Sequence, residues 1–253
     1  MVSPNAESLM VNDDAPVGRL LSRREAVAIL GATGAALLTG STHGVQRAEA
    51  RLHGLSCVAR PEQMEGPYFV DEKLNRTDIR PDPGNGEARP GTPLALTLLV
   101  SSVRATECRP LAGAMVDLWQ CDALGVYSDV RDAQFNTVGQ KFLRGYQTTD
   151  ARGEARFVTV YPGWYRGRAV HIHFKIRAPQ SGQRALEFTS QLYFDDALTD
   201  RVHAVAPYAS RGKRSTRNRD DGIYRRGGDQ LLLAPTESGG TYSASFAIGL
   251  QMP

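Results

Sequence analysis

Cysteine is scarce in this sequence, and its spacing is not that of a metal site. Cys57, Cys108 and Cys121 are the three cysteines of the 253-residue chain, and none of them forms a C-x-x-C motif. A thiolate metal site is therefore not expected. Three cysteines cannot all pair within one chain, so the sequence predicts one intrachain disulfide at most.

The sequence also lacks the charge runs of nucleic-acid-binding proteins and the long apolar run of a membrane span. Its 30 basic and 27 acidic residues give a formal net charge of +3. No basic run is interleaved with aromatic residues, so nucleic acid is not an expected partner. The apolar stretch at residues 26–38 is too short and too rich in glycine to be a stable membrane span. Hydrophobic residues at 41% and charged residues at 23% instead suit one globular domain.

Residues 1–50 have the organisation of an export signal. Residues 22–24 (Ser-Arg-Arg) precede the apolar stretch, and residues 48–50 (Ala-Glu-Ala) offer a small-residue cleavage site. The paired arginines favour the twin-arginine route, which carries folded proteins. The alternative is an amphipathic helix with two chance arginines. We expect a mature chain that begins at Arg51 and lies in the periplasm or outside the cell.

The remainder, residues 51–253, is predicted to be one all-β domain. Residues 51–92 are rich in Pro, Gly, Asp and Arg without a sustained period, which predicts a loop-rich N-terminal arm. Residues 150–153 (Asp-Ala-Arg-Gly) are expected to form a hairpin turn between two strands. About seven short strands and no long helical period predict a β-sandwich. The expected strands are residues 94–100, 114–120, 144–149, 154–161, 169–176, 188–194 and 242–250.

A pair of histidines interrupts one of these apolar strands. His171 and His173 are two residues apart, and residues i and i+2 of a strand project from the same face. The pair is either a solvated polar face or part of a metal site, since imidazole suits iron, copper and zinc alike. The opposite face would be buried by alternating apolar residues, namely Val170, Ile172, Phe174 and Ile176.

Motifs on both sides of the pair favour the metal site. Upstream, a strand ending near Trp119 leads to Tyr127 on a loop, and a Pro-Gly-x-Tyr turn ends at Tyr165. The turn leads into Arg168-x-x-His-x-His, and Gln191-Leu-x-Phe follows downstream. In this order and spacing the motifs resemble the intradiol ring-cleavage dioxygenases, which include the catechol, hydroxyquinol and protocatechuate dioxygenases.

The resemblance runs from about Cys57 to the C-terminus. It is especially close to the exported, single-domain branch of the family, through residues 65–68 (Glu-Gly-Pro-Tyr) and residues 194–200 (Phe-Asp-Asp-Ala-Leu-Thr-Asp). It implies that Arg168 and Gln191 lie beside the bound substrate. It also implies four ligands for a non-haem iron(III): the phenolates of Tyr127 and Tyr165 and the imidazoles of His171 and His173. Iron(III) favours anionic oxygen, whereas two phenolates suit zinc and copper poorly.

The resemblance further implies a reaction. A catechol would bind the iron through both oxygens, and Tyr165 would leave the metal and accept a proton. Arg168 and Gln191 would stabilise negative charge as the ring reacts with O2, giving a muconic-acid-type product. Two residues separate Tyr165 from Arg168, fewer than in the protocatechuate enzymes, which implies a more open site. The preferred ring substituent and the oligomeric state stay open.

Two other functions compete with this interpretation. A β-sandwich could be a non-catalytic binding module, because fold alone does not specify activity. A copper or zinc protein could be built on His171 and His173. Among the other polar residues, His203 is expected on a helical turn with a structural role, and Trp119 is expected to pack. Tyr68 and Trp164 are candidate pocket walls.

Two structural expectations concern single residues. Arg168 has the wrong strand parity to join the histidines, so the backbone must turn before Ala169, and Gly167 allows this. Cys108 and Cys121 are predicted not to be bonded, because a strand of seven residues at ~3.3 Å each would separate them by roughly 20 Å. Cys57 is the better partner for Cys121 if a bond exists.

Overall fold

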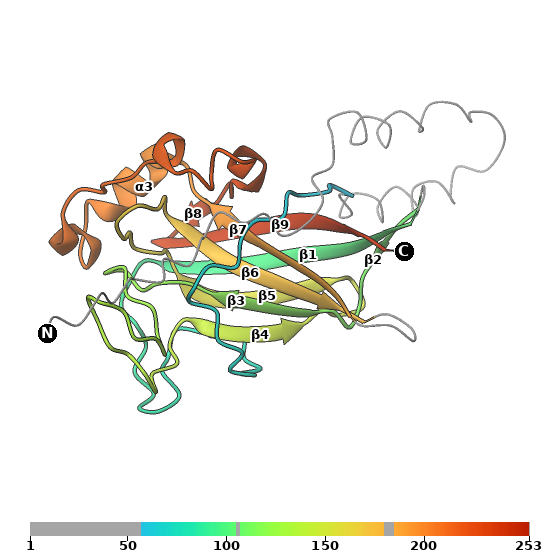
Figure 1. Cartoon of the computed structure of the whole chain (residues 1–253), viewed down its shortest axis with the longest axis horizontal. Helices are drawn as coiled ribbons and strands as arrows, with labels where there is room; N and C mark the ends of the chain where they lie inside the picture. Colours follow the sequence, from blue (N-terminus) through green and yellow to red (C-terminus); the bar gives the residue numbers. More distant parts are fainter. Residues whose placement is uncertain (1–56, 105–106, 180–184, 253) are drawn as a thin grey trace, which may run out of the picture.

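Two β-sheets packed face to face form the body of the molecule, with short helices at one end (Figure 1). The computed structural model describes residues 57–104, 107–179 and 185–252. The predicted β-sandwich is confirmed. The predicted export signal at residues 1–50 lies outside the described residues.

The first sheet is built around β1 (Pro93–Arg104). One edge of β1 pairs in parallel with β9 (Thr241–Gln251). The other edge pairs antiparallel with β5 (Glu154–Val160) along its first half and with β2 (Glu107–Pro110) along its second half. The short β8 (Thr236–Ser238) completes the sheet beside β9.

The second sheet carries the histidines. Its order is β4-β3-β6-β7, with every neighbouring pair antiparallel. The strands are β3 (Met115–Trp119), β4 (Arg144–Thr148), β6 (His171–Ala178) and β7 (Leu186–Tyr193).

Alternating apolar residues from both sheets fill the space between them. In β6, Ile172, Phe174 and Ile176 are fully buried in the main core. Leucines 94, 96 and 98 of β1 join the same cluster from the facing sheet. Each such side chain contributes roughly 1.5–3 kcal/mol by leaving water. This burial holds β6 in one register, so its histidines must project from the outer face.

The N-terminal arm covers that outer face. Gln191 Nε2 donates to Met64 O at 3.0 Å, and Lys175 forms an ion pair with Glu65. Further along the arm, the Phe69 ring packs against Trp119 with centroids 4.8 Å apart. The predicted arm is therefore a wall over the histidine strand.

A helical segment follows β7 at the end of the sandwich where β6 begins (Figure 1). It contains α3 (Asp196–His203), whose first turn is capped by the Asp195 carboxylate accepting from Leu198 N at 2.9 Å. Three 3₁₀ helices follow: η1 (Tyr208–Arg211), η2 (Asn218–Asp220) and η3 (Gly228–Leu231). The expected helical placement of His203 is confirmed. In the described ranges, no helix has the length and apolarity that crossing a membrane requires.

The expected hairpin at residues 150–153 is wrong. The turn is present, with Gly153 N donating to Asp150 O at 2.9 Å. Its two strands, however, belong to different sheets, because β4 pairs with β3 and β5 pairs with β1. The edge of β4 that a hairpin partner would occupy is already bonded to the arm, through Tyr146 N to Leu74 O and Arg76 N to Tyr146 O. Strands β2 and β8 were not predicted.

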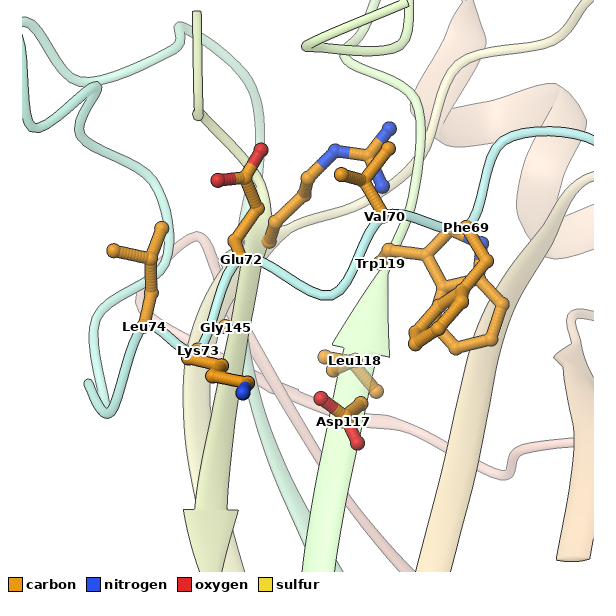
Figure 2. Close-up of a pocket in the computed structure, with 10 residues that line it drawn as sticks. Phe69, Val70, Glu72, Lys73, Leu74, Asp117, Leu118, Trp119 and Gly145 are labelled. Carbon is orange, nitrogen blue, oxygen red and sulfur yellow. The ribbon is translucent and has the colours of Figure 1, made fainter.

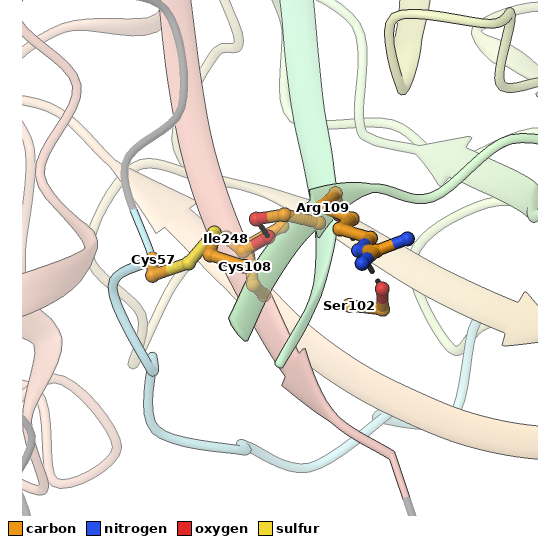
Figure 3. The surroundings of a disulfide bond; sticks show 6 residues. Cys57, Ser102, Cys108, Arg109 and Ile248 are labelled. Carbon is orange, nitrogen blue, oxygen red and sulfur yellow. Dashed lines mark hydrogen bonds between the residues drawn. A yellow bond between two sulfur atoms is a disulfide. The ribbon is translucent and has the colours of Figure 1, made fainter. Parts of the chain in front are cut away.

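The cysteine pairing differs from expectation (Figure 3). Cys57 is bonded to Cys108, with Cα atoms 6.0 Å apart, and Cys121 is free and buried. The prediction that Cys108 and Cys121 are not bonded is confirmed, but the choice of Cys121 as the partner of Cys57 is wrong. β1 extends beyond the expected residue 100, so Cys108 returns on β2 opposite Val103. The start of the arm lies at that end, where Val58 O accepts from Gly249 N.

Candidate active site

Two imidazoles meet on the outer face of β6. The Nε2 atoms of His171 and His173 lie 2.9 Å apart, with the rings nearly perpendicular at 81°. Both residues are buried, at 2% and 1% exposure. The Trp119 ring on β3 stacks on His173 with centroids 4.9 Å apart, because Trp119 and His173 are register partners. Trp119 therefore packs, as expected, but against the histidine pair.

Two tyrosines from separate loops complete the cluster. The Tyr165 hydroxyl, on the loop before β6, lies 3.1 Å from His171 Nε2. The Tyr127 hydroxyl, on the loop after β3, lies 3.5 Å from the same nitrogen. The sequence placed these four side chains on three different segments, and the fold brings their polar atoms together.

Close backbone contact between the two loops brings the tyrosines together. Gly125 has φ +79°, and a Cβ there would lie 2.2 Å from Trp164 O. A Cβ on Gly163 would lie 2.4 Å from Ala123 O. Glycine is needed at both positions, because any side chain would push the loops apart.

The hydrogen bonds around His171 indicate that a cation fits this cluster. His171 Nδ1 lies 2.7 Å from Ala169 O, and a carbonyl accepts only, so Nδ1 carries the proton. His171 Nε2 then offers one lone pair to three polar neighbours: two phenol oxygens and the other imidazole nitrogen. Hydrogen bonds cannot satisfy all of them at once. A metal ion between them would satisfy all four.

Burial determines the charge of these groups. It lowers the pKa of both imidazoles well below 6.5, which keeps them in the neutral form that binds metals. It also raises the pKa of Tyr165 to about 12 and that of Tyr127 well above 10. The phenols therefore ionise at neutral pH only beside a cation.

The donor set favours a hard ion. Two phenol oxygens and two imidazole nitrogens suit a highly charged cation better than zinc. Over the described ranges, no group of three or more His, Cys, Asp or Glu side chains is placed to hold a metal.

Arg168 and Gln191 lie beside the histidines. Gln191 is the register partner of His173 on β7, and its Oε1 accepts from the Arg168 guanidinium and from Tyr193 OH at 3.0 Å. Gly167 has φ +87°, which is the turn that the sequence required before Ala169. All six predicted site residues are therefore gathered in one region.

Tyr68 of the arm forms the roof of this region. Its ring stacks on Tyr127 with centroids 4.5 Å apart, and its hydroxyl donates to Asp132 Oδ2 at 2.7 Å. Trp164, the other candidate wall, turns toward the helical segment, where its Nε1 donates to Gly212 O at 3.3 Å. Figure 2 shows a hollow that adjoins the site through Trp119, but neither the histidine pair nor the two tyrosines line it.

Two carboxylates of the site were missed by sequence reasoning. Asp221 accepts from Arg168 Nε at 3.0 Å, although 53 residues separate them. Asp132 bonds the hydroxyl of Tyr68 across 64 residues. Neither lies in a motif with a fixed spacing to its partner, so the sequence carried no signal for either contact.

Comparison with known proteins shows which family the chain belongs to. A protein-family model described as "Dioxygenase" matches residues 64–211, more than half of the chain. An intradiol ring-cleavage dioxygenase from Tetranychus urticae has a similar structure, with 30% sequence identity and a TM-score of 0.66. The match covers 77% of this chain and 95% of that one. The chain belongs to the intradiol ring-cleavage dioxygenase family.

Other members of the family are similar over most of this fold. The dioxygenase domain of a carbohydrate-binding fusion protein from Streptomyces sp. SirexAA-E matches 78% of this chain and 100% of its own, with 29% identity and a TM-score of 0.54. The protocatechuate 3,4-dioxygenase beta chain of Burkholderia cepacia is 31% identical over 159 residues, which are 58% of this chain and 66% of that one. A chlorocatechol 1,2-dioxygenase from Pseudomonas putida is 26% identical, over 57% of this chain and 58% of that one. The chain thus spans less than two thirds of the length of these two curated relatives.

Proposed function

We propose that this protein is a non-haem iron(III) dioxygenase that cleaves catechol rings between the two hydroxylated carbons. It would consume O2 and release a muconic-acid-type product. The observation that carries the proposal is the convergence of two phenols on a buried histidine pair, within 3.5 Å of His171 Nε2, in a member of this family. Members of the family typically use non-haem iron(III).

The four residues Tyr127, Tyr165, His171 and His173 would hold the iron. When bound, the iron supplies Lewis acidity that binds the two catechol oxygens and activates the ring toward O2. The buried imidazoles would contribute neutral ligands. The two tyrosines would contribute the negative charge that iron(III) favours.

The two tyrosines differ in how firmly they are held. Tyr127 is buried at 1% exposure, lies under the Tyr68 ring, and its backbone oxygen accepts from Thr137 Oγ1 at 2.6 Å. Tyr165 is only partly buried and lies on a short turn that ends at Gly167. Tyr165 is therefore the side chain that can swing away as substrate enters, and its phenolate oxygen can accept a substrate proton.

Arg168 and Gln191 would act on the bound ring. The guanidinium and the amide are held together beside His173, inside a largely buried region. Donors fixed in a site of low dielectric stabilise developing negative charge without reorganising first. We assign to both side chains the role of stabilising the negative charge that appears on the ring oxygens during cleavage.

The substrate would be a catechol produced outside the cytoplasm. The relatives are named for catechol, chlorocatechol, hydroxyquinol and protocatechuate, which supports the substrate class. The arginine pair at residues 23–24 supports export by the twin-arginine route. Replacing both arginines with lysine is expected to leave the protein in the cytoplasm, and unimpaired secretion would point to the general route.

Oxygen uptake by the iron-loaded protein tests the proposal. The mature chain from residue 51 should hold about one iron and be red-brown from phenolate-to-iron charge transfer. It should consume O2 with at least one member of a panel of substituted catechols. Tyr146→Phe is a matched control, since Tyr146 lies on β4 and contacts none of the four proposed ligands in the described structure. Stoichiometric zinc or copper without iron-dependent oxygen uptake would contradict the proposal, and catechol binding without oxygen uptake would favour a binding module.

A further inference from the structure

A buried carboxylate lies directly behind Arg168. Asp221 is 1% exposed, and its Oδ2 accepts from Arg168 Nε at 3.0 Å and from Ala169 N at 2.8 Å. Its Oδ1 accepts from Ile223 N at 2.7 Å and from Tyr224 N at 3.2 Å. Both oxygens are therefore tied to fixed backbone groups, and the carboxylate has no freedom to move away from the guanidinium.

This anchorage determines where Arg168 points. Arg168 follows Gly167 at φ +87° on an exposed turn, and an arginine there could otherwise extend into solvent. With Nε held by Asp221, the terminal NH2 group is directed at Gln191 Oε1, opposite His173. The same Oδ2 atom also holds the backbone at Ala169, two residues before the first histidine.

The pair also sets the charge at the position of Arg168. Arg168 is 16% exposed in its side chain and Asp221 is 1% exposed, so solvent screens the two charges little. Their sum is zero. Lys175 is paired with Glu65. Arg144 is a second buried cation, whose guanidinium donates to the neutral backbone oxygens of Ser128 and Tyr68, and it stays the same in all the variants compared below. The cation that touches Gln191 is therefore neutralised by its own partner.

We infer that Asp221 is a positioning residue that aims Arg168 at the substrate and cancels its charge. Arg168 then contacts the ring through hydrogen bonds, and the neutral pair adds no attraction for an acidic ring substituent. This inference rests on the proposed function, because it concerns the same site. It predicts that selectivity between neutral and carboxylated catechols follows the net charge of the Arg168–Asp221 pair.

Equilibrium binding of two probes tests the inference. Catechol and 3,4-dihydroxybenzoate are titrated calorimetrically into the iron-loaded protein without oxygen, so that no turnover occurs. Asp221→Asn keeps the shape and one acceptor oxygen but leaves Arg168 with an uncompensated charge. Because an unpaired charge in a partly buried site attracts an opposite charge more strongly than in water, the carboxylated probe should gain at least about tenfold in affinity relative to catechol.

Removing the cation should have the opposite effect. Arg168→Met removes the positive charge, while three backbone N–H groups still donate to the Asp221 carboxylate. The relative affinity for the carboxylated probe should then fall by about tenfold or more. The double variant is neutral again, and its affinity ratio should return to that of the wild type. Arg168→Met also keeps the inference testable if Asp221→Asn does not fold.

Asp196→Asn provides the matched control. Asp196 belongs to the same segment and forms a similar ion pair with Arg214 at 2.7 Å, without contact to Arg168. It should leave the affinity ratio unchanged. The inference would be overturned if Asp221→Asn changed the affinity for both probes equally. It would also be overturned if Arg168→Met did not lower the affinity for the carboxylated probe relative to catechol. Either result would leave the proposed function intact. A wild-type protein that bound iron but neither probe would instead overturn the proposed function and, with it, the inference.

Discussion

Gly125→Ala should separate the two loops that carry the candidate tyrosine ligands. The new Cβ would lie 2.2 Å from Trp164 O, whereas real Cβ atoms almost never approach another heavy atom within 3.0 Å. The loops must therefore move apart by roughly 1 Å. Tyr165 follows Trp164 directly, and its hydroxyl lies 3.1 Å from His171 Nε2, so a shift of this size removes it from ligand distance.

The expected loss in the free energy of unfolding has two parts, conformational and steric, that a control variant can separate. Gly125 has φ +79°, and a non-glycine residue in the left-handed region costs about 1–2 kcal/mol. Gly113 has nearly the same φ, +78°, but a Cβ there meets nothing within 4 Å. Gly113→Ala should therefore lower the free energy of unfolding by the conformational cost alone. Gly125→Ala should lower it by about 3 kcal/mol or more, because the steric conflict adds to that cost.

Denaturant unfolding, iron content and the charge-transfer absorbance measure the difference. Gly113→Ala should keep its iron and its colour despite reduced stability. Gly125→Ala should retain far less iron even when it is folded. If the two variants lost equal stability and kept equal iron, the close approach of the loops would not be what assembles the site.

Three further perturbations give distinct results. Tyr165→Phe should keep some iron but lose most oxygen uptake. Tyr127→Phe should shift the charge-transfer band, while the other phenolate still colours the protein. Identical spectra and wild-type rates in both variants would contradict the roles assigned to the two tyrosines. His173→Gln should sharply reduce iron retention by elemental analysis, because one of four ligands is lost, and full retention would remove it from the ligand set. Replacing Cys57 and Cys108 with serine should lower the free energy of unfolding by up to about 4 kcal/mol, because the bond closes a loop with a sequence separation of 51. Iron should be retained, since the bond joins the start of the arm to β2, at the end of the sandwich opposite the helical segment (Figure 1). An unchanged unfolding midpoint would show that other contacts hold the arm equally well.

Local patterns in the sequence by themselves determined much of the site. The alternation of apolar residues in β6 required His171 and His173 to share the outer face, because strand side chains alternate with a period of two. Gly167 permitted the turn that brings Arg168 to the same side. These inferences succeeded because each depends on residues within a few positions of one another.

Contacts between distant segments were decided only by the tertiary structure. The turn at residues 150–153 has the local chemistry of a hairpin, yet bonding of the arm to β4 leaves that edge unavailable and sends the next strand to the other sheet. Cys57 pairs with Cys108 because the extension of β1 returns Cys108 on β2, beside the start of the arm. Asp221 reaches Arg168 across 53 residues through the packing of the helical segment against the end of the sandwich. In each case the residue's own neighbours in sequence are compatible with several partners, and the choice among them depends on which surfaces the whole chain buries together.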